Sequence, residues 1–284
     1  MRAIVFLGMM AWLCPGPAAA ADRGGAEAAA DLSIDERGGI VVPVMLGGAG
    51  PFSFMLDTGA TRTLVGDDLA GLLNAPLVAR AEMITSAGSE MRGVVRLERV
   101  EVAGARAASL LASVLPAERL RALASGVRGL LGQDFLSAFN YTLDYRRRRL
   151  IWDEPGDVRC GEPSALRLIP VEGRYVVEVS RSGLARALRL VPDTGAETFV
   201  FFHAPGEAVP AIAIGRARLT GLTGDRSVRI ASTSRLVVGG VTLRDQPVVI
   251  VDRTDASADG LLPLHGFASV SFNMTDACLV VRGR

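Results

Sequence analysis

Histidine and cysteine are scarce in this chain of 284 residues, which contains two histidines and three cysteines. The histidines, His203 and His265, lie far apart in the sequence, and no cluster of cysteines accompanies either of them. This scarcity excludes a zinc site built from grouped His and Cys ligands, and we expect no metal. Neither histidine is accompanied by a Gly-x-Ser-x-Gly segment, so a serine triad lacks a candidate nucleophile.

Long hydrophobic runs are absent beyond the N-terminus, so the sequence predicts no membrane-spanning helix there. Residues 1–21 have the features of a secretory signal. Arg2 supplies the charge, residues 3–13 form a short apolar core, and residues 17–21 are small. Cys14 is preceded by leucine, where lipidation normally needs a small residue, so we discount a lipid anchor. The alternative is an uncleaved N-terminal anchor. We expect a periplasmic or secreted protein with no stable membrane association after signal removal.

An excess of charge of either sign is also absent. Removing residues 1–21 removes Arg2 and no acid, so the mature chain carries 31 − 1 = 30 basic residues against 30 acidic ones. This balance argues against nucleic acid or an anionic membrane as the main partner. Apolar residues make up 49% of the chain, which excludes wholesale disorder. The remaining 284 − 21 = 263 residues are enough for two modest cores.

Signal removal leaves only two cysteines, Cys160 and Cys278. In an oxidising compartment a single remaining pair is expected to form a disulfide bond. Residues 22–35 begin with an Ala- and Gly-rich stretch. We expect them to form a flexible leader before the first lobe.

The tetrapeptide Asp-Thr-Gly-Ala occurs twice, at Asp57–Ala60 and at Asp193–Ala196. Each copy ends one apolar run and precedes another, which places each aspartate at the tip of a buried strand. A carboxylate is costly to bury there, and the glycine that follows lets backbone approach closely. Two such carboxylates brought together can share a single proton. The repeated motif therefore predicts a catalytic pair, Asp57 and Asp193.

The two motifs belong to a longer internal repeat, in which the numbering of the second copy is offset by 193 − 57 = 136. Without gaps, Ile40-Val41 aligns with Val176-Val177 and Leu64 with Val200. Two later segments also correspond, the second after one or two inserted residues: Gly129–Gly132 with Gly260–Pro263, and Phe139–Thr142 with Phe272–Thr275. The order of strand, motif, long middle segment, Gly-Leu-Leu and final strand thus occurs twice.

Each copy reads mostly as β-branched strands bounded by glycine and polar clusters. Helical patterning is limited to Asp67–Leu73 and Pro116–Ala124, the second with proline in its first turn. A polar connection rich in proline and glycine separates the copies. We therefore expect an all-β fold with few short helices: lobe 1 at residues 36–153, a linker at 154–165 and lobe 2 at 166–284.

These motifs resemble those of the retropepsin-like and pepsin-like aspartic peptidases, particularly bacterial secreted members. The resemblance rests on the strands that end in Asp-Thr-Gly-Ala and on Gly-Leu-Leu-Gly-x-Asp-Phe-Leu at residues 129–136. It covers about residues 36–284 and is closer in lobe 1. It implies two duplicated β-barrel-like lobes about a pseudo-two-fold axis, with both Asp-Thr-Gly loops at the base of a cleft. Pro192 and Pro263 depart from the pattern, so we expect a distorted second loop.

The resemblance also implies roles for the residues of both motifs. One aspartate deprotonates a water and the other polarises the peptide carbonyl, so no cofactor is implied. Which aspartate is the base is left open. Thr58 and Thr194 are expected to hydrogen-bond across the axis, and Gly59 and Gly195 to let backbone amides reach the carboxylates.

A substrate-covering flap is the remaining element that the resemblance implies. Residues 84–90 are the candidate in lobe 1, including Ser86, Gly88 and Ser89, and residues 222–225 are their counterpart. A generic surface hairpin explains both segments equally well.

These features predict a secreted or periplasmic aspartic endopeptidase, monomeric, with both aspartates in one chain. It would bind an extended peptide or protein substrate by pairing its backbone with the flap. Two alternatives are a protease-fold binding module without activity and a protease that assembles its site from two lobe-1 copies. The run Arg146–Arg149 predicts no more than a solvated turn.

Overall fold

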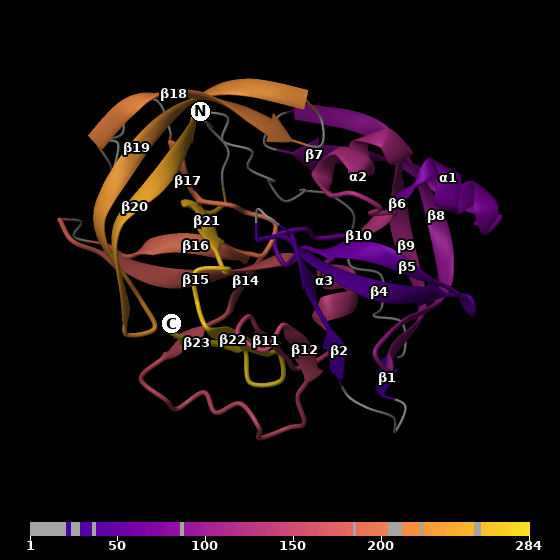
Figure 1. The fold of residues 1–284 in the computed structure, drawn as a ribbon, viewed down its shortest axis with the longest axis horizontal. Helices are drawn as coiled ribbons and strands as arrows, with labels where there is room; N and C mark the ends of the chain where they lie inside the picture. Colours follow the sequence, from indigo (N-terminus) through magenta and orange to yellow (C-terminus); the bar gives the residue numbers. More distant parts are fainter. Residues whose placement is uncertain are drawn as a thin grey trace.

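The computed structural model describes residues 21–23, 29–35, 38–85, 88–183, 186–203, 212–221, 224–252 and 257–284. Strands dominate this part of the chain. They form two lobes, lobe 2 at the left and lobe 1 at the right of Figure 1, with a third sheet below and between them. The proposed signal, residues 1–21, lies outside the described residues except for Ala21. No helix among the described residues is long and apolar enough to cross a membrane.

Lobe 1 contains a six-stranded barrel, because the pairing of β8 with β9 closes the sheet order β9-β6-β10-β5-β4-β8. Three further strands attach to it: β1 pairs with β9, β3 with β4, and β7 with β8. The bounds are β1 Ala21–Arg23, β3 Ser33–Ile34, β4 Ile40–Leu46, β5 Ala49–Leu56, β6 Leu64–Gly66, β7 Leu77–Thr85, β8 Gly88–Val102, β9 Ala105–Leu115 and β10 Gly129–Leu131.

Lobe 2 repeats this barrel, since β15 pairs with β19 and closes the order β15-β16-β21-β17-β20-β19. Strands β14 and β18 attach to β15 and β19 respectively. The bounds are β14 Ile169–Val171, β15 Arg174–Arg181, β16 Leu188–Asp193, β17 Phe199–His203, β18 Ile212–Gly221, β19 Gly224–Val238, β20 Val241–Asp252 and β21 Gly260–Pro263.

The numbering offset of 136 holds across most of the two barrels. Strands β8 and β19 begin at Gly88 and Gly224 and end at Val102 and Val238, and both differences equal 136. The offset then falls to 260 − 129 = 131 at the starts of β10 and β21. Lobe 2 is therefore five residues shorter between these strands, in the interval where lobe 1 has its second helix.

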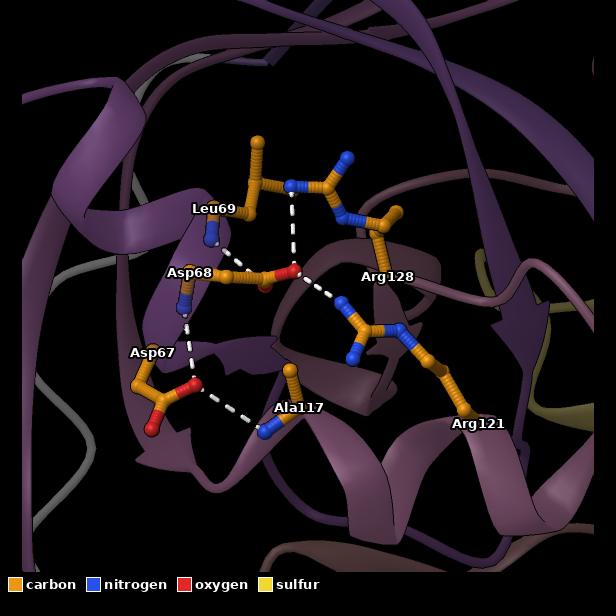
Figure 2. A network of polar contacts seen from close by, with 6 residues as sticks. All are labelled: Asp67, Asp68, Leu69, Ala117, Arg121 and Arg128. Atoms are coloured by element: carbon orange, nitrogen blue, oxygen red, sulfur yellow. Dashed lines mark hydrogen bonds and ion pairs between the residues drawn. The ribbon is translucent and has the colours of Figure 1, made fainter.

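The three helices of the described chain belong to lobe 1: α1 Asp67–Leu72, α2 Ala117–Leu123 and α3 Gln133–Leu136. The first two lie where the sequence predicts them, and the third was missed. Figure 2 shows the polar network that holds α1 against α2. Asp67 Oδ1 accepts from the Ala117 amide at 3.0 Å, and Asp68 Oδ2 pairs with Arg121 at 2.5 Å and with Arg128 at 3.3 Å.

The third sheet joins the two lobes through the order β13-β23-β22-β11-β12-β2. Its strands are β2 Ala29–Asp31, β11 Tyr141–Asp144, β12 Arg149–Trp152, β13 Ala165–Arg167, β22 Ser269–Asn273 and β23 Cys278–Arg282. The expectation of a flexible leader at residues 22–35 is wrong for residues 29–34. These residues pair with β12 and β4 as β2 and β3, and Leu32 between them is buried in the core.

One detail of the sequence alignment is also wrong. Phe139–Thr142 and Phe272–Thr275 are not counterparts, because β11 ends at Asp144 where β22 ends at Asn273, an offset of 273 − 144 = 129. Both end residues accept the amide of the third residue that follows, Arg147 and Asp276. The two aligned segments are instead in contact, since Asn140 Oδ1 accepts the amides of residues 274 and 275.

The predicted disulfide bond is confirmed. Cys160, in the connection between the lobes, is bonded to Cys278 at the start of β23. The bond closes a sequence separation of 118 residues. It therefore fixes the inter-lobe connection to the sheet that both lobes share.

Candidate active site

The two Asp-Thr-Gly segments meet in the interior and exchange hydrogen bonds. The Thr58 hydroxyl donates to the carbonyl oxygen of Pro192 at 2.8 Å, and the Thr194 hydroxyl donates to that of Leu56 at 2.6 Å. Each hydroxyl also accepts the backbone amide of the other threonine, at 3.0 and 3.1 Å. All four bonds are buried, and each lobe fixes the loop of the other.

The carboxyl groups of Asp57 and Asp193 lie beside these hydrogen bonds. Asp57 is 3% exposed and Asp193 is 0% exposed. Asp57 Oδ1 accepts the amides of Gly59 and Ala60 at 2.9 and 3.0 Å. Asp193 Oδ1 accepts the amide of Gly195 at 2.7 Å. The first aspartate thus has two backbone donors and the second has one, which favours negative charge on Asp57.

The motif glycines lie where a side chain would strike the carboxyl groups. A Cβ atom on Gly59 would lie 2.6 Å from both Cγ and Oδ2 of Asp193. A Cβ atom on Gly195 would lie 3.2 Å from Asp193 Oδ1 and 3.2 Å from Asp57 Oδ2. The Cβ position of Gly195 is thus 3.2 Å from one oxygen of each carboxyl group, so both groups lie at one site.

Burial and mutual repulsion distribute the ionisation of this pair unequally. Burial raises the pKa of Asp57 to about 6, although the amides of Gly59 and Ala60 lower it. Burial and the charge of Asp57 raise the pKa of Asp193 well above its usual range. The contact between the carboxyl groups lowers the pKa of Asp57 and raises that of Asp193. The mutual contact and the number of backbone donors therefore favour the shared proton on Asp193 and the negative charge on Asp57.

A parallel strand supports each aspartate from behind. In lobe 1, β10 lies alongside β5, and the Asp57 amide donates to Leu131 O at 3.0 Å. Gln133, at the start of α3, donates its side-chain amide to Thr58 O at 2.8 Å and its backbone amide to Ala60 O at 2.9 Å. Nothing in the sequence repeat could indicate Gln133, because Leu264 occupies its place in lobe 2 at the offset of 131.

Small apolar clusters fill the space next to both catalytic loops, and their members correspond. Met55, Ala60, Leu64, Leu115 and Leu130 belong to the cluster of lobe 1. Val191, Ala196, Val200, Val251 and Leu261 take the same places in lobe 2. The side chains of these residues are apolar, so they support both loops by packing alone.

Pro192 has an effect that differs from the expected distortion of the second loop. In lobe 1 the ladder between β4 and β5 reaches Leu56, directly before the aspartate. In lobe 2 the ladder between β15 and β16 stops at Leu190, because a proline at 192 has no amide to donate. The Pro192 carbonyl still accepts the hydrogen bond from the Thr58 hydroxyl, so the hydrogen bonds between the two loops are intact.

The flap candidates lie on two matching hairpins, β7–β8 and β18–β19, seen at the top of Figure 1. Strand pairing extends to Thr85 and Gly88 in the first hairpin and to Gly221 and Gly224 in the second. Ser89 on β8 is exposed, whereas Ser86 and residues 222–223 lie outside the described residues. On β8, Glu90 pairs with Arg119 of α2 at 2.7 Å, which fixes this hairpin to a helix.

One charged residue near the aspartates was not foreseen. Arg174, the first residue of β15, is only 3% exposed, and its positive charge lowers the pKa of both Asp57 and Asp193. Arg174 comes near the aspartates because the two lobes are in contact, and no local pattern in the sequence reveals that contact. Among the described residues, no group of three or more His, Cys, Asp or Glu could hold a metal ion.

Paired carboxyl groups on symmetric loops define a carboxylate dyad. Residues 42–135, from β4 to α3, match a family model described as aspartyl protease. A retropepsin-like aspartic protease from Rickettsia conorii matches at 17% identity and a TM-score of 0.32, covering 47% of this chain and 93% of its own. No curated protein sequence matches the chain.

Two basic 7S globulins match over nearly the full length. Basic 7S globulin from soybean has 10% identity and a TM-score of 0.50, covering 98% of this chain and 95% of its own. Conglutin gamma, a basic 7S globulin from lupine seeds, has 11% identity and a TM-score of 0.49, covering 99% and 95%. The two barrels and the soybean likeness confirm the expected two-lobed, aspartic-protease-like fold.

Proposed function

We propose that this protein is a secreted or periplasmic aspartic endopeptidase. The observation that carries the proposal is the pair of buried aspartates held at one point by the hydrogen bonds exchanged between the lobes. Two acids that share one proton supply a base and an acid at the same place. The apolar N-terminal segment and the disulfide bond support export.

The two aspartates have different tasks in the proposed reaction. Asp57, ionised and held by two amides, takes a proton from a water molecule. Asp193, which carries the shared proton, polarises the scissile carbonyl through a hydrogen bond, and the proton that Asp57 took from water passes to the departing amine, so the dyad returns to its starting state. The substrate is an extended peptide that pairs with the hairpins as an added strand.

Replacement of either aspartate by asparagine tests this function. Asp57→Asn and Asp193→Asn each remove one member of the dyad while keeping its size, so each should abolish hydrolysis of a denatured protein substrate. Circular dichroism should show that both variants keep the fold. Full activity in Asp193→Asn would exclude the intrachain dyad and favour a site made from two lobe-1 copies.

A binding module is the second candidate, because a protein named basic 7S globulin shares the fold. The retained aspartates argue against it, since a buried carboxylate costs stability and a pure scaffold has no need of two. Absence of hydrolysis by the wild type from pH 4 to 8, on denatured protein substrates, would favour the module.

A further inference from the structure

Arg174 is a buried cation that has no counterpart at the equivalent position of lobe 1. The position that corresponds to it in lobe 1 is Gly38, since 174 − 136 = 38, and glycine has no side chain. Gly38 lies against the ring of His265 from the other lobe. The dyad is thus built from two similar halves but has an arginine on one side only.

The hairpin that carries Arg174 approaches the loop of Asp57 from lobe 2. Its turn, Glu172-Gly173, has positive φ angles of 49° and 75° and joins Val171 to Arg174 in a tight two-residue connection. A Cβ atom on Gly173 would lie 3.5 Å from the side chain of Thr61. The turn therefore packs on the residue that directly follows Asp57–Ala60.

The charge of Arg174 reaches both members of the dyad, whose pKa values it lowers. The charge of Asp57 in turn raises the pKa of Asp193. Burial and then the charge of Asp193 raise the pKa of the Tyr145 phenol, which stays neutral. His265 interacts with the backbone of the second loop, and burial and the charge of Arg284 lower the pKa of its imidazole. Glu172 in the turn is exposed. Arg174 is thus the cation that offsets burial of the negative charge.

We propose that Arg174 is a positioning residue that holds the dyad in its singly charged form and fixes the Asp57 loop against lobe 2. This inference rests on the proposed function, because a singly charged dyad is the reactive form of an aspartic protease. A buried anion needs a nearby cation to remain charged at mild pH. The cation favours one negative charge on the dyad, and the two backbone donors of Asp57 favour that charge on Asp57.

Titration of the aspartate carboxyl groups by ¹³C NMR tests the inference without any need for activity. We expect Arg174→Met and Arg174→Gln to raise the titration midpoint of Asp57 by about one pH unit. Arg174→Lys should restore most of the shift, because it keeps the charge. Arg181→Met is the matched control on the same strand, and it should leave the midpoint unchanged.

The pH–rate profile gives a second readout that a purely structural arginine would not move. On the acidic limb, a shift of one unit lowers the singly charged fraction, and with it kcat/KM, about tenfold. At pH values above the midpoint of this limb in both the wild type and the variant, the neutral variants should approach wild-type rates. An inactive wild type would refute the proposed function and leave the NMR result valid. Unchanged midpoints in the neutral variants would overturn the role of Arg174 alone.

A double-mutant cycle covers the case in which the neutral variants fail to fold. If Arg174 acts through the charge of Asp57, then Arg174→Met should be less destabilising in the Asp57→Asn background than in the wild type. Equal loss of stability in both backgrounds would show a structural arginine with no electrostatic coupling, and would overturn the proposal.

Discussion

Gly59 and Gly195 occupy equivalent positions, yet the structure predicts very different costs for a methyl group at each. Neither has a φ angle in the left-handed region, so alanine is compatible with the backbone at both sites. A Cβ atom on Gly59 lies 2.6 Å from Asp193 Cγ, whereas ordinary contact begins at 3.4 Å, so the carboxyl group must move well away from its place. At Gly195 the nearest carboxyl oxygens lie at 3.2 Å, and a retreat of a few tenths of an ångström relieves the contact.

A misplacement of about 1 Å in a catalytic group costs about a hundredfold in rate. We therefore expect Gly59→Ala to lower kcat/KM about a hundredfold and Gly195→Ala less than about tenfold. Overpacking should also destabilise Gly59→Ala by about 1–3 kcal/mol. Peptide hydrolysis and urea unfolding of both variants measure these effects, with each variant serving as the control of the other.

The Asp193→Ala background separates the clash from other effects. It removes the atoms that the new methyl group would strike, so Gly59→Ala should lose most of its destabilisation there. The reasoning is refuted if Gly195→Ala is the more damaging substitution, or if Gly59→Ala keeps wild-type activity. A destabilisation that persists without the Asp193 carboxyl group would show that a different contact is responsible.

Three further outcomes follow from the site and the disulfide bond. Activity should rise with pH through about 6 as Asp57 ionises. The double variant Ala60→Ser with Ala196→Ser should shift the midpoint of this rise to lower pH, because the added hydroxyl groups donate to the charged carboxylate. An unchanged midpoint would reject the role of the hydroxyl groups. The raised pKa of Asp57 means that its stabilising contribution is complete below its unfolded value of 3.8 and is lost as pH rises through about 6, so thermal unfolding should show a higher Tm for Asp57→Asn than for wild type at pH 7 but not at pH 4. Thiol counting on the unreduced, unfolded protein should find neither Cys160 nor Cys278 free, and replacing both by serine should cost about 2–4 kcal/mol in urea unfolding.

The repeat made most of the barrel architecture predictable. A constant numbering offset of 136 indicates that both halves fold alike, and it relates β4–β9 of lobe 1 to β15–β20 of lobe 2. The prediction failed where the halves differ in length or contact one another. The last strands were aligned out of register because residues 139–142 and 272–275 share the pattern Phe-Asn-x-Thr, although these segments contact each other and are not counterparts.

The parts of the site that lie within the motifs could be predicted, and those that depend on the meeting of the lobes could not. Both aspartates and both threonines follow from the tetrapeptide itself. Arg174 and Gln133 come close to the dyad through a hairpin and a four-residue helix, elements too short to leave a periodic pattern. Strands β2 and β3 were missed for the same reason, because they have only three and two residues.

The threonine hydroxyl groups form hydrogen bonds across the two lobes, so the centre of this molecule resembles a dimer interface within one chain. Two identical subunits around a symmetry axis must carry every substitution twice, so an arginine beside their axis would always face its own copy. A single covalent chain is free of that constraint. It can have arginine at 174 and glycine at 38, and can thereby assign unlike chemical tasks to two aspartates that sit in nearly the same loop.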